Sequence, residues 1–194
     1  TSGTNAGMIT IQGISSGKPS LTTSSTTGAI STFNFIAWRV TNLELIATGA
    51  SGNAILLSGP VTLDNCKISD SGAEAIGLSF AAGNGATIIS NEIGGGSITG
   101  VYSVTGTGII FAYNYVHSIS GTALVNTATT GTGEQVIIGN VLNGAGSTGR
   151  GIYISGAVAT LGVPNLIVGN TIYGWGNSGL ECRNRSQAGY RDRH

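Results

Sequence analysis

Ile88-Ile-Ser-Asn-Glu-Ile93 is one of six segments in which two apolar residues stand five positions apart with an asparagine between them. The first apolar residues of successive segments are 23 to 30 residues apart: Val40, Leu63, Ile88, Phe111, Ile137 and Ile167. A further apolar strand follows each segment, as in Gly151-Ile-Tyr-Ile154. One such coil cannot bury its own apolar side, so coils of this period stack into a solenoid. The repeat therefore predicts a parallel β-helix of about six to seven coils.

The composition agrees with an all-β chain of many short strands. Of the 194 residues, 33 are glycine and only 8% are charged. Glycine, serine and asparagine favour turns, while isoleucine and valine favour strands over helices. No stretch of linker composition divides the repeat, so we expect one single-stranded β-helix over residues 1–182, with Met8–Gly13 as the strand of an initial coil.

The asparagines between the apolar pairs are predicted to be structural. Asparagine tolerates the left-handed backbone of a tight turn, and its amide can bond to an asparagine of the next coil. We expect one column of such residues and no catalytic row: Asn42, Asn65, Asn91, Asn114, Asn140 and Asn170.

These segments, in particular Ile-Ser-Asn-Glu-Ile93, Ile-Gly-Asn-Val-Leu142 and Val-Gly-Asn-Thr-Ile172, resemble the pectate-lyase-like right-handed parallel β-helix superfamily. The resemblance covers roughly Ile9 to Cys182. It implies a right-handed solenoid and a place among polysaccharide lyases, polygalacturonase-type glycosidases, epimerases, phage tailspikes and surface adhesins. The Asn-Thr-Asp, Asp-Asp, Gly-His-Gly and Arg-Ile-Lys signatures of polygalacturonases are absent, as are the Trp-x-Asp-His and Arg-x-Pro-x-x-Arg segments of pectate lyases.

Aligning the repeats predicts which side chains share an outer surface. The residue before each second apolar member should point outward, and this column reads Glu44, Lys67, Glu92, Tyr115, Val141 and Thr171. A second outward column two residues later contains His117. Lys67, Glu92, Tyr115 and His117 form the candidate catalytic group, because uronate elimination needs a base and a cation, and glycoside hydrolysis needs two carboxyl groups.

Specific roles follow for a lyase or a glycosidase. In a lyase, Lys67 or His117 would be the base, Tyr115 the proton donor and Glu92 a metal or hydrogen-bond partner. In a glycosidase, Glu44 and Glu92 would be about 10 Å apart by strand spacing, nearer an inverting separation. The alternative is that Glu44, Lys67 and Glu92 form only a solvated salt-bridge row.

Further residues could bind a glycan or a metal ion. Asp64, Asp70 and Glu74 are candidate oxygen ligands for Ca²⁺, with turn capping or solvation as the alternative. Arg150 could contact a carboxylate or pack over Tyr153, and the packing arrangement is favoured. The candidate substrate-binding residues are Glu44, Tyr102, Arg150, Tyr153, Tyr173 and Trp175.

The net charge, the cysteines and the chain ends limit which partners we expect for this protein. The formal net charge is zero, which argues against nucleic acid or an anionic membrane as partner, and no apolar run approaches a membrane span. Cys66 and Cys182 fall about 19 Å apart by coil spacing, too far to pair, so Cys66 should be a buried thiol. Residues 183–194 carry four of the six arginines and are predicted to be a basic tail. Open solenoid ends could support a homo-oligomer.

The sequence thus leaves two leading functions. One is an extracellular, carbohydrate-active β-helix that cleaves or binds a polysaccharide along its outer strand face. The other is a non-catalytic module of a tailspike, adhesin or surface fibre, which could be part of a longer solenoid. An ice-binding solenoid is disfavoured because no regular Thr-x-Thr column occurs at the outward positions of the alignment.

Overall fold

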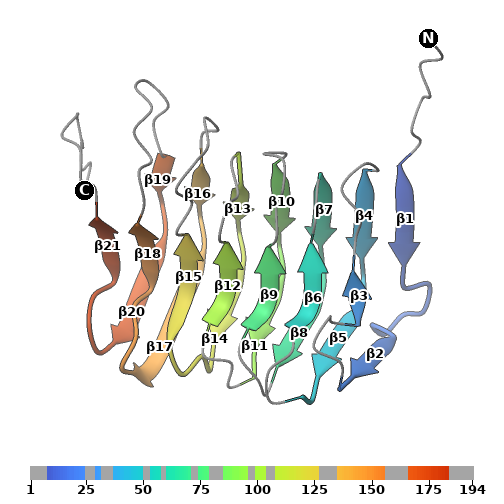
Figure 1. Cartoon of the computed structure of the whole chain (residues 1–194), viewed down its shortest axis with the longest axis horizontal. Helices are drawn as coiled ribbons and strands as arrows, with labels where there is room; N and C mark the ends of the chain where they lie inside the picture. The colour runs from blue at the N-terminus through green and yellow to red at the C-terminus, as the bar shows by residue number, and fades with distance from the viewer. Residues whose placement is uncertain are drawn as a thin grey trace, which may run out of the picture.

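The computed structural model describes residues 8–24, 29–31, 37–49, 53–57, 60–70, 74–78, 85–95, 99–103, 108–126, 135–155 and 166–183. These residues form 21 strands in three sheets of seven, and no helix occurs among them (Figure 1). Accordingly, the described ranges contain no helix that is long and apolar enough to cross a membrane.

Each sheet takes every third strand of the chain. Sheet A consists of β1 (Ile9–Gln12), β4 (Trp38–Thr41), β7 (Val61–Asp64), β10 (Ala86–Ile89), β13 (Ile110–Ala112), β16 (Val136–Ile138) and β19 (Leu166–Val168). Sheet B consists of β2 (Ser20–Thr23), β5 (Glu44–Ala47), β8 (Lys67–Asp70), β11 (Glu92–Gly94), β14 (Tyr115–His117), β17 (Val141–Ser147) and β20 (Thr171–Trp175). Sheet C consists of β3 (Ile30–Ser31), β6 (Asn53–Leu57), β9 (Glu74–Leu78), β12 (Thr99–Ser103), β15 (Thr122–Asn126), β18 (Ile152–Ser155) and β21 (Leu180–Arg183).

The predicted parallel β-helix is confirmed. All strand pairs are parallel, and each sheet runs along the whole solenoid, so a residue in one coil lies beside its equivalent in the next. The expected initial strand is also present as β1, which pairs with β4. Of the predicted tail, only Arg183 falls within the description, at the end of β21.

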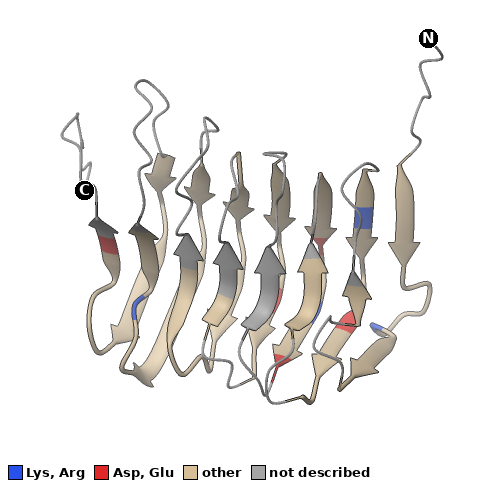
Figure 2. Cartoon of the chain, in the orientation of Figure 1, with Lys and Arg blue, Asp and Glu red and all other residues tan. Residues whose placement is uncertain are grey.

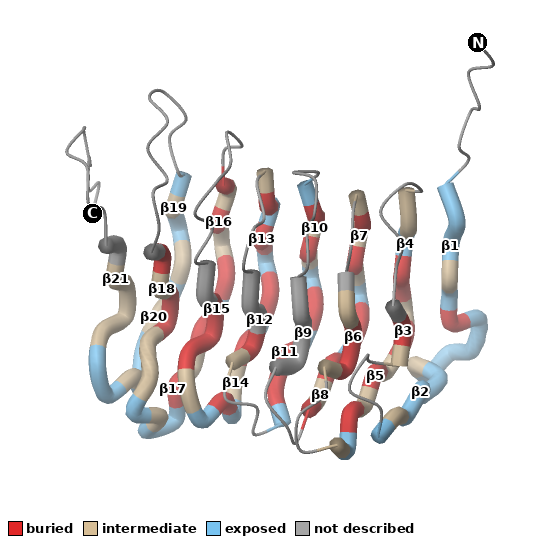
Figure 3. Tube along the Cα trace, viewed as in Figure 1, coloured by how far each residue is buried: buried red, intermediate tan, exposed pale blue. Residues whose placement is uncertain are grey.

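The first apolar residue of each repeat points into the core. Val40, Leu63, Ile88, Phe111 and Ile137 are at most 1% exposed and lie in register along sheet A. Removing these side chains from water supplies the main driving force for stacking the coils. Figure 3 shows that buried residues run through the middle coils, whereas more residues are exposed at β1, β2 and β19.

The prediction of a single asparagine column was wrong, because the structure contains two columns at the corner between sheets A and B. Asn42 and Asn65 stand two residues after the first apolar member and have left-handed backbones, with φ of 56° and 50°. Asn91, Asn114, Asn140 and Asn170 stand three residues after it, and the first three are 1–2% exposed. The left-handed backbone therefore belongs to the outer position, and the buried amide belongs to the inner one.

The inner column forms a hydrogen-bonded ladder. The side-chain amide of Asn114 donates to the Ile88 carbonyl at 2.9 Å and to Asn140 Oδ1 at 3.0 Å. Its own Oδ1 accepts from the backbone and side-chain nitrogens of Asn91, at 2.9 and 3.1 Å. The same pattern links Asn140 to Asn170. The ladder thus satisfies polar groups that the corner turns bury.

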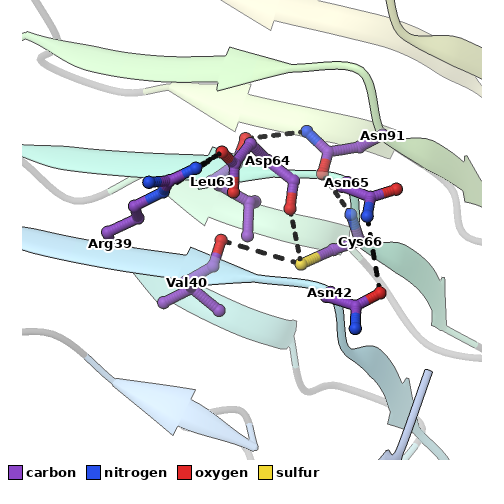
Figure 4. Close-up of polar contacts among 8 residues, drawn as sticks. All are labelled: Arg39, Val40, Asn42, Leu63, Asp64, Asn65, Cys66 and Asn91. Carbon is purple, nitrogen blue, oxygen red and sulfur yellow. Dashed lines mark hydrogen bonds and ion pairs between the residues drawn. The ribbon is translucent and has the colours of Figure 1, made fainter. Parts of the chain in front are cut away.

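Cys66 occupies the next position of this ladder. Its Sγ donates to the Val40 carbonyl at 3.7 Å, which is the carbonyl position that the asparagine amides reach in later coils, and lies 3.3 Å from the Asp64 carbonyl (Figure 4). Its backbone nitrogen donates to Asn91 Oδ1 at 2.9 Å. Burial raises the pKa of the thiol. The expected buried, free thiol is therefore confirmed for Cys66.

Candidate functional site

The outward side chains of sheet B form two adjacent rows across six successive strands, as the repeat alignment predicts. Register pairs Glu44 with Lys67, Lys67 with Glu92, and Glu92 with Tyr115. His117 pairs with Asn143, which pairs with Tyr173. We call this surface the outer strip; its members are Glu44, Lys67, Glu92, Tyr115, His117, Asn143 and Tyr173.

Glu44 and Lys67 form an ion pair at the N-terminal end of the outer strip. Lys67 Nζ lies 3.3 Å from Glu44 Oε1, and the Ser20 hydroxyl donates to the other carboxylate oxygen. The hydrogen bond from Ser20, followed by that from Lys67, lowers the pKa of Glu44. A carboxyl group held ionised cannot serve as the general acid of a glycosidase, which needs a raised pKa.

Glu92, Tyr115 and His117 form a second group in the middle of the outer strip. His117 Nε2 lies 3.3 Å from Glu92 Oε1 on the preceding strand, and Nδ1 lies 3.1 Å from the Ser118 hydroxyl. The imidazole also stacks on the Tyr115 ring with 4.6 Å between centroids. Three of the four predicted catalytic residues are thus in direct contact, and the fourth, Lys67, pairs in register with Glu92.

Gly94 makes the contact between Glu92 and His117 sterically possible. A Cβ at this position would lie 3.0 Å from the Cε1 of His117 and 2.8 Å from its carbonyl oxygen. The imidazole therefore occupies space that any other residue at position 94 would fill. The sequence alignment places Gly94 in the same outward column as His117, but its role depends on the ring orientation.

The contacts of this group hold the imidazole in one orientation. Both imidazole nitrogens have partners, so His117 is fixed as a flat ring beside Tyr115 with its polar edge satisfied. The two rings and the neighbouring carboxylate combine an apolar face with hydrogen-bonding groups, a combination suited to a sugar ring. Tyr115 is 42% exposed and therefore accessible to a ligand.

Tyr173 and Trp175, both predicted to bind substrate, differ in their availability. Tyr173 extends the outer strip and is 48% exposed. Trp175 instead packs against the core, and its indole N–H donates to the Leu142 carbonyl at 3.1 Å. Trp175 therefore presents only part of its ring to solvent.

Arg150 and Tyr153 lie on a different face from the outer strip. The Arg150 guanidinium stands 4.8 Å from the centre of the Tyr153 ring and forms an ion pair with Glu181. The predicted packing of Arg150 over Tyr153 thus occurs, and Glu181 of the chain itself pairs with the guanidinium. Tyr153 and Glu181 pair in register between β18 and β21 of sheet C.

The three predicted calcium ligands belong to three different sheets. Asp64 lies in sheet A, where it forms a 2.6 Å ion pair with Arg39 that already compensates its charge. Asp70 is buried at the end of β8, and Glu74 begins β9 with its side chain outside the described residues. No group of three potential metal ligands occurs among the residues that the structure describes. The side chain of the remaining candidate, Tyr102 in β12, also falls outside the description.

Sequence reasoning missed Tyr113, the most exposed aromatic side chain among those described, at 61%. It lies at the corner between sheets A and B, one residue before the ladder residue Asn114. The available signal was its place in the repeat, since the equivalent residues of the other aligned coils are asparagine, serine or glycine.

Charged residues are sparse over the described surface (Figure 2). The outer strip contains two carboxylates and one ammonium group, so its charge is close to balanced. Comparison of the chain with known proteins finds no matching family model, no matching curated protein and no matching solved structure. The fold and the arrangement of the outer strip are therefore the basis for a functional conclusion.

Proposed function

We propose that this protein is an extracellular or surface-exposed glycan-binding solenoid whose outer strip holds a polysaccharide chain without cleaving it. The observation that carries the proposal is the stacked Tyr115 and His117 pair, fixed by Glu92 and open to solvent. Stacked rings offer apolar area at low entropic cost, and the carboxylate beside them accepts hydrogen bonds from sugar hydroxyls.

Linear geometry supports a polymer as the ligand. The members of the outer strip recur on neighbouring strands, about 4.8 Å apart, so the same type of contact can repeat along one direction. Tyr115 and Tyr173 stand two strands apart in sheet B, with β17 between them. The resemblance of the repeats to the pectate-lyase-like superfamily, which includes adhesins and tailspikes, also supports a surface role.

The near balance of charge favours a neutral polysaccharide over a polyuronate. Glu44 and Lys67 neutralise each other, which leaves Glu92, hydrogen-bonded to His117, as the remaining carboxylate of the strip. A polyanion would meet the Glu92 carboxylate without a free cation beside it on the described strip, and like-charge contact opposes binding.

A binding panel tests the proposal. Isothermal titration calorimetry with a soluble mannan, a xylan, a mixed-linkage glucan and polygalacturonate should show saturable binding to at least one neutral polymer. Tyr115→Ala should weaken that binding about ten-fold, since an aromatic contact contributes roughly 0.5–1.5 kcal/mol beyond its buried area. Tyr153→Ala, which removes an aromatic ring from sheet C on a different face, is the matched control. Full affinity in Tyr115→Ala would show that the strip is not the binding surface.

A lyase activity is the second candidate, favoured by the carboxylate and imidazole contact itself. On this hypothesis His117, freed from Glu92 by substrate, removes a proton next to a uronate carboxylate, Lys67 neutralises that carboxylate and Tyr115 protonates the leaving oxygen. Incubation with polygalacturonate, with and without Ca²⁺, would then produce unsaturated products that absorb ultraviolet light. Unchanged turnover in both Glu92→Gln and His117→Ala would remove these residues from the chemistry.

A further inference from the structure

Tyr113 holds a backbone conformation that its side chain disfavours. Its φ is 54°, in the left-handed region, where a bulky residue is an outlier. The equivalent positions of the other coils are also left-handed but carry residues suited to it: Asn42, Asn65, Ser90, Gly139 and Gly169. The scaffold thus needs a left-handed residue at this corner, but it does not need an aromatic one.

The ring of Tyr113 rests on the next coil. Its Cδ1 and Cε1 atoms occupy the space that a Cβ at Gly139 would take, at 2.7 and 2.6 Å from that position. Because glycine at position 139 has no Cβ, it leaves space for the ring to pack there, and 61% of the tyrosine remains exposed. Strained residues that present an exposed functional group are concentrated at binding sites.

The surroundings of Tyr113 are apolar on one side and belong to the outer strip on the other. The outward residues of β13, β16 and β19 that reach the surface are all apolar: Ile110, Val136, Ile138, Leu166 and Val168. Tyr115, the first residue of the strip on β14, follows only two residues along the chain, so the two Cα atoms are within about 7 Å. No charged side chain stands at these outward positions of the described strands.

We propose that Tyr113 is a carbohydrate-stacking residue that extends the glycan site from the outer strip around the corner onto sheet A. The proposal rests on the proposed function and sharpens its ligand to an uncharged pyranose polymer, since the extension offers apolar surface and no charge to a carboxylated sugar. An exposed aromatic ring that packs against a glycine of the next coil suits the apolar face of such a sugar.

Substitution by glycine separates binding from stability. Tyr113→Gly removes the ring and also relieves the left-handed backbone, so it should raise the urea midpoint while it lowers affinity for the neutral polysaccharide about ten-fold. Tyr113→Phe should retain affinity because it keeps the ring. Ser90→Gly is the matched control: it occupies the same corner position with φ of 58°, and it should raise the midpoint without changing affinity.

The outcomes distinguish this inference from the proposed function. If Tyr113→Gly binds as tightly as the unaltered chain while Tyr115→Ala does not, the inference is overturned and the strip keeps its function. If Tyr113→Gly loses affinity and Tyr115→Ala does not, the corner is the site and the strip proposal fails. A lower urea midpoint in Tyr113→Gly with full affinity would make the ring a packing residue only, and the absence of binding to every polymer would refute both proposals.

Discussion

Asn114→Ala should destabilise the solenoid strongly although it removes only a few atoms. The side chain makes four hydrogen bonds in a site where Asn114 is 1% exposed. Alanine leaves the buried backbone N–H of Asn91 without its oxygen acceptor and takes a donor away from the Ile88 carbonyl. It also interrupts the chain of amides that connects Asn91 with Asn140.

The size of the effect follows from these losses. A buried polar group left without a partner costs about 1–3 kcal/mol, so two such groups give an expected loss of about 2–6 kcal/mol. Urea unfolding followed by circular dichroism measures this loss, and with a slope of about 2 kcal/mol/M the midpoint should fall by roughly 1–3 M.

Asn65→Gly is the control, because glycine keeps the left-handed backbone and removes only an exposed amide. That amide donates one long bond of 3.4 Å to Asn42 and accepts from Lys18 at 2.8 Å, so the expected loss is below about 1 kcal/mol. Equal destabilisation by Asn114→Ala and Asn65→Gly would refute the division into an inner ladder and an outer turn position.

Cys66→Asn provides the reciprocal test of the ladder. An asparagine there could donate to the Val40 carbonyl, where the thiol now makes a weak 3.7 Å contact, and to Asn91 Oδ1. The midpoint should rise or remain unchanged, whereas a polar substitution at an ordinary core position is destabilising. A drop comparable to that of Asn114→Ala would mean that Cys66 does not occupy a ladder position.

Two further changes test the outer strip. Gly94→Ala should break the contact between His117 and Glu92, and an NMR titration should detect this as altered chemical shifts of the imidazole. The variant should also be less stable, because the new methyl group meets the His117 carbonyl. Unaltered imidazole shifts would contradict the steric argument. Ser20→Ala should raise the pKa of Glu44 toward its ordinary value of 4.5, measured by carboxyl NMR. Because the pKa of Glu44 is lowered in the folded state, its ionised carboxylate stabilises the fold above pH 4.5, and this contribution is lost as the pH falls through the folded pKa. An unchanged pKa of Glu44 in Ser20→Ala would exclude the Ser20 hydroxyl as the cause of the lowered pKa.

The repeat in the sequence was sufficient to predict the fold and the outward columns. Burial of one apolar residue per strand fixes the register of each coil, because a shift by one residue would turn every side chain of the strand to the opposite face. Glu44, Lys67 and Glu92 therefore stand on neighbouring strands as expected. The inner and outer asparagines were harder to separate, since both fall between the same two apolar residues and differ by only one position.

Contacts that depend on side-chain direction could not be predicted from the columns. The imidazole of His117 turns toward the preceding strand because Gly94 leaves space there. Arg150, two residues before β18, contacts both Glu181 on β21 and Tyr153 on β18. A repeat alignment does not distinguish between these two partners. Tyr113 lies outside the two outward columns of the alignment, so the columns do not assign it to a surface, although an aromatic residue at this corner is the exception.

Tyr113, Asn114 and Tyr115 show how this scaffold separates stability from surface chemistry. Asn114 points inward and carries four hydrogen bonds of the ladder, while the tyrosines on either side are 61% and 42% exposed. Because consecutive residues at the corner face opposite directions, one segment supports the coil and presents the rings that a ligand would meet. Substitution of the asparagine should therefore change the urea midpoint, and substitution of either tyrosine should change glycan affinity without loss of the fold.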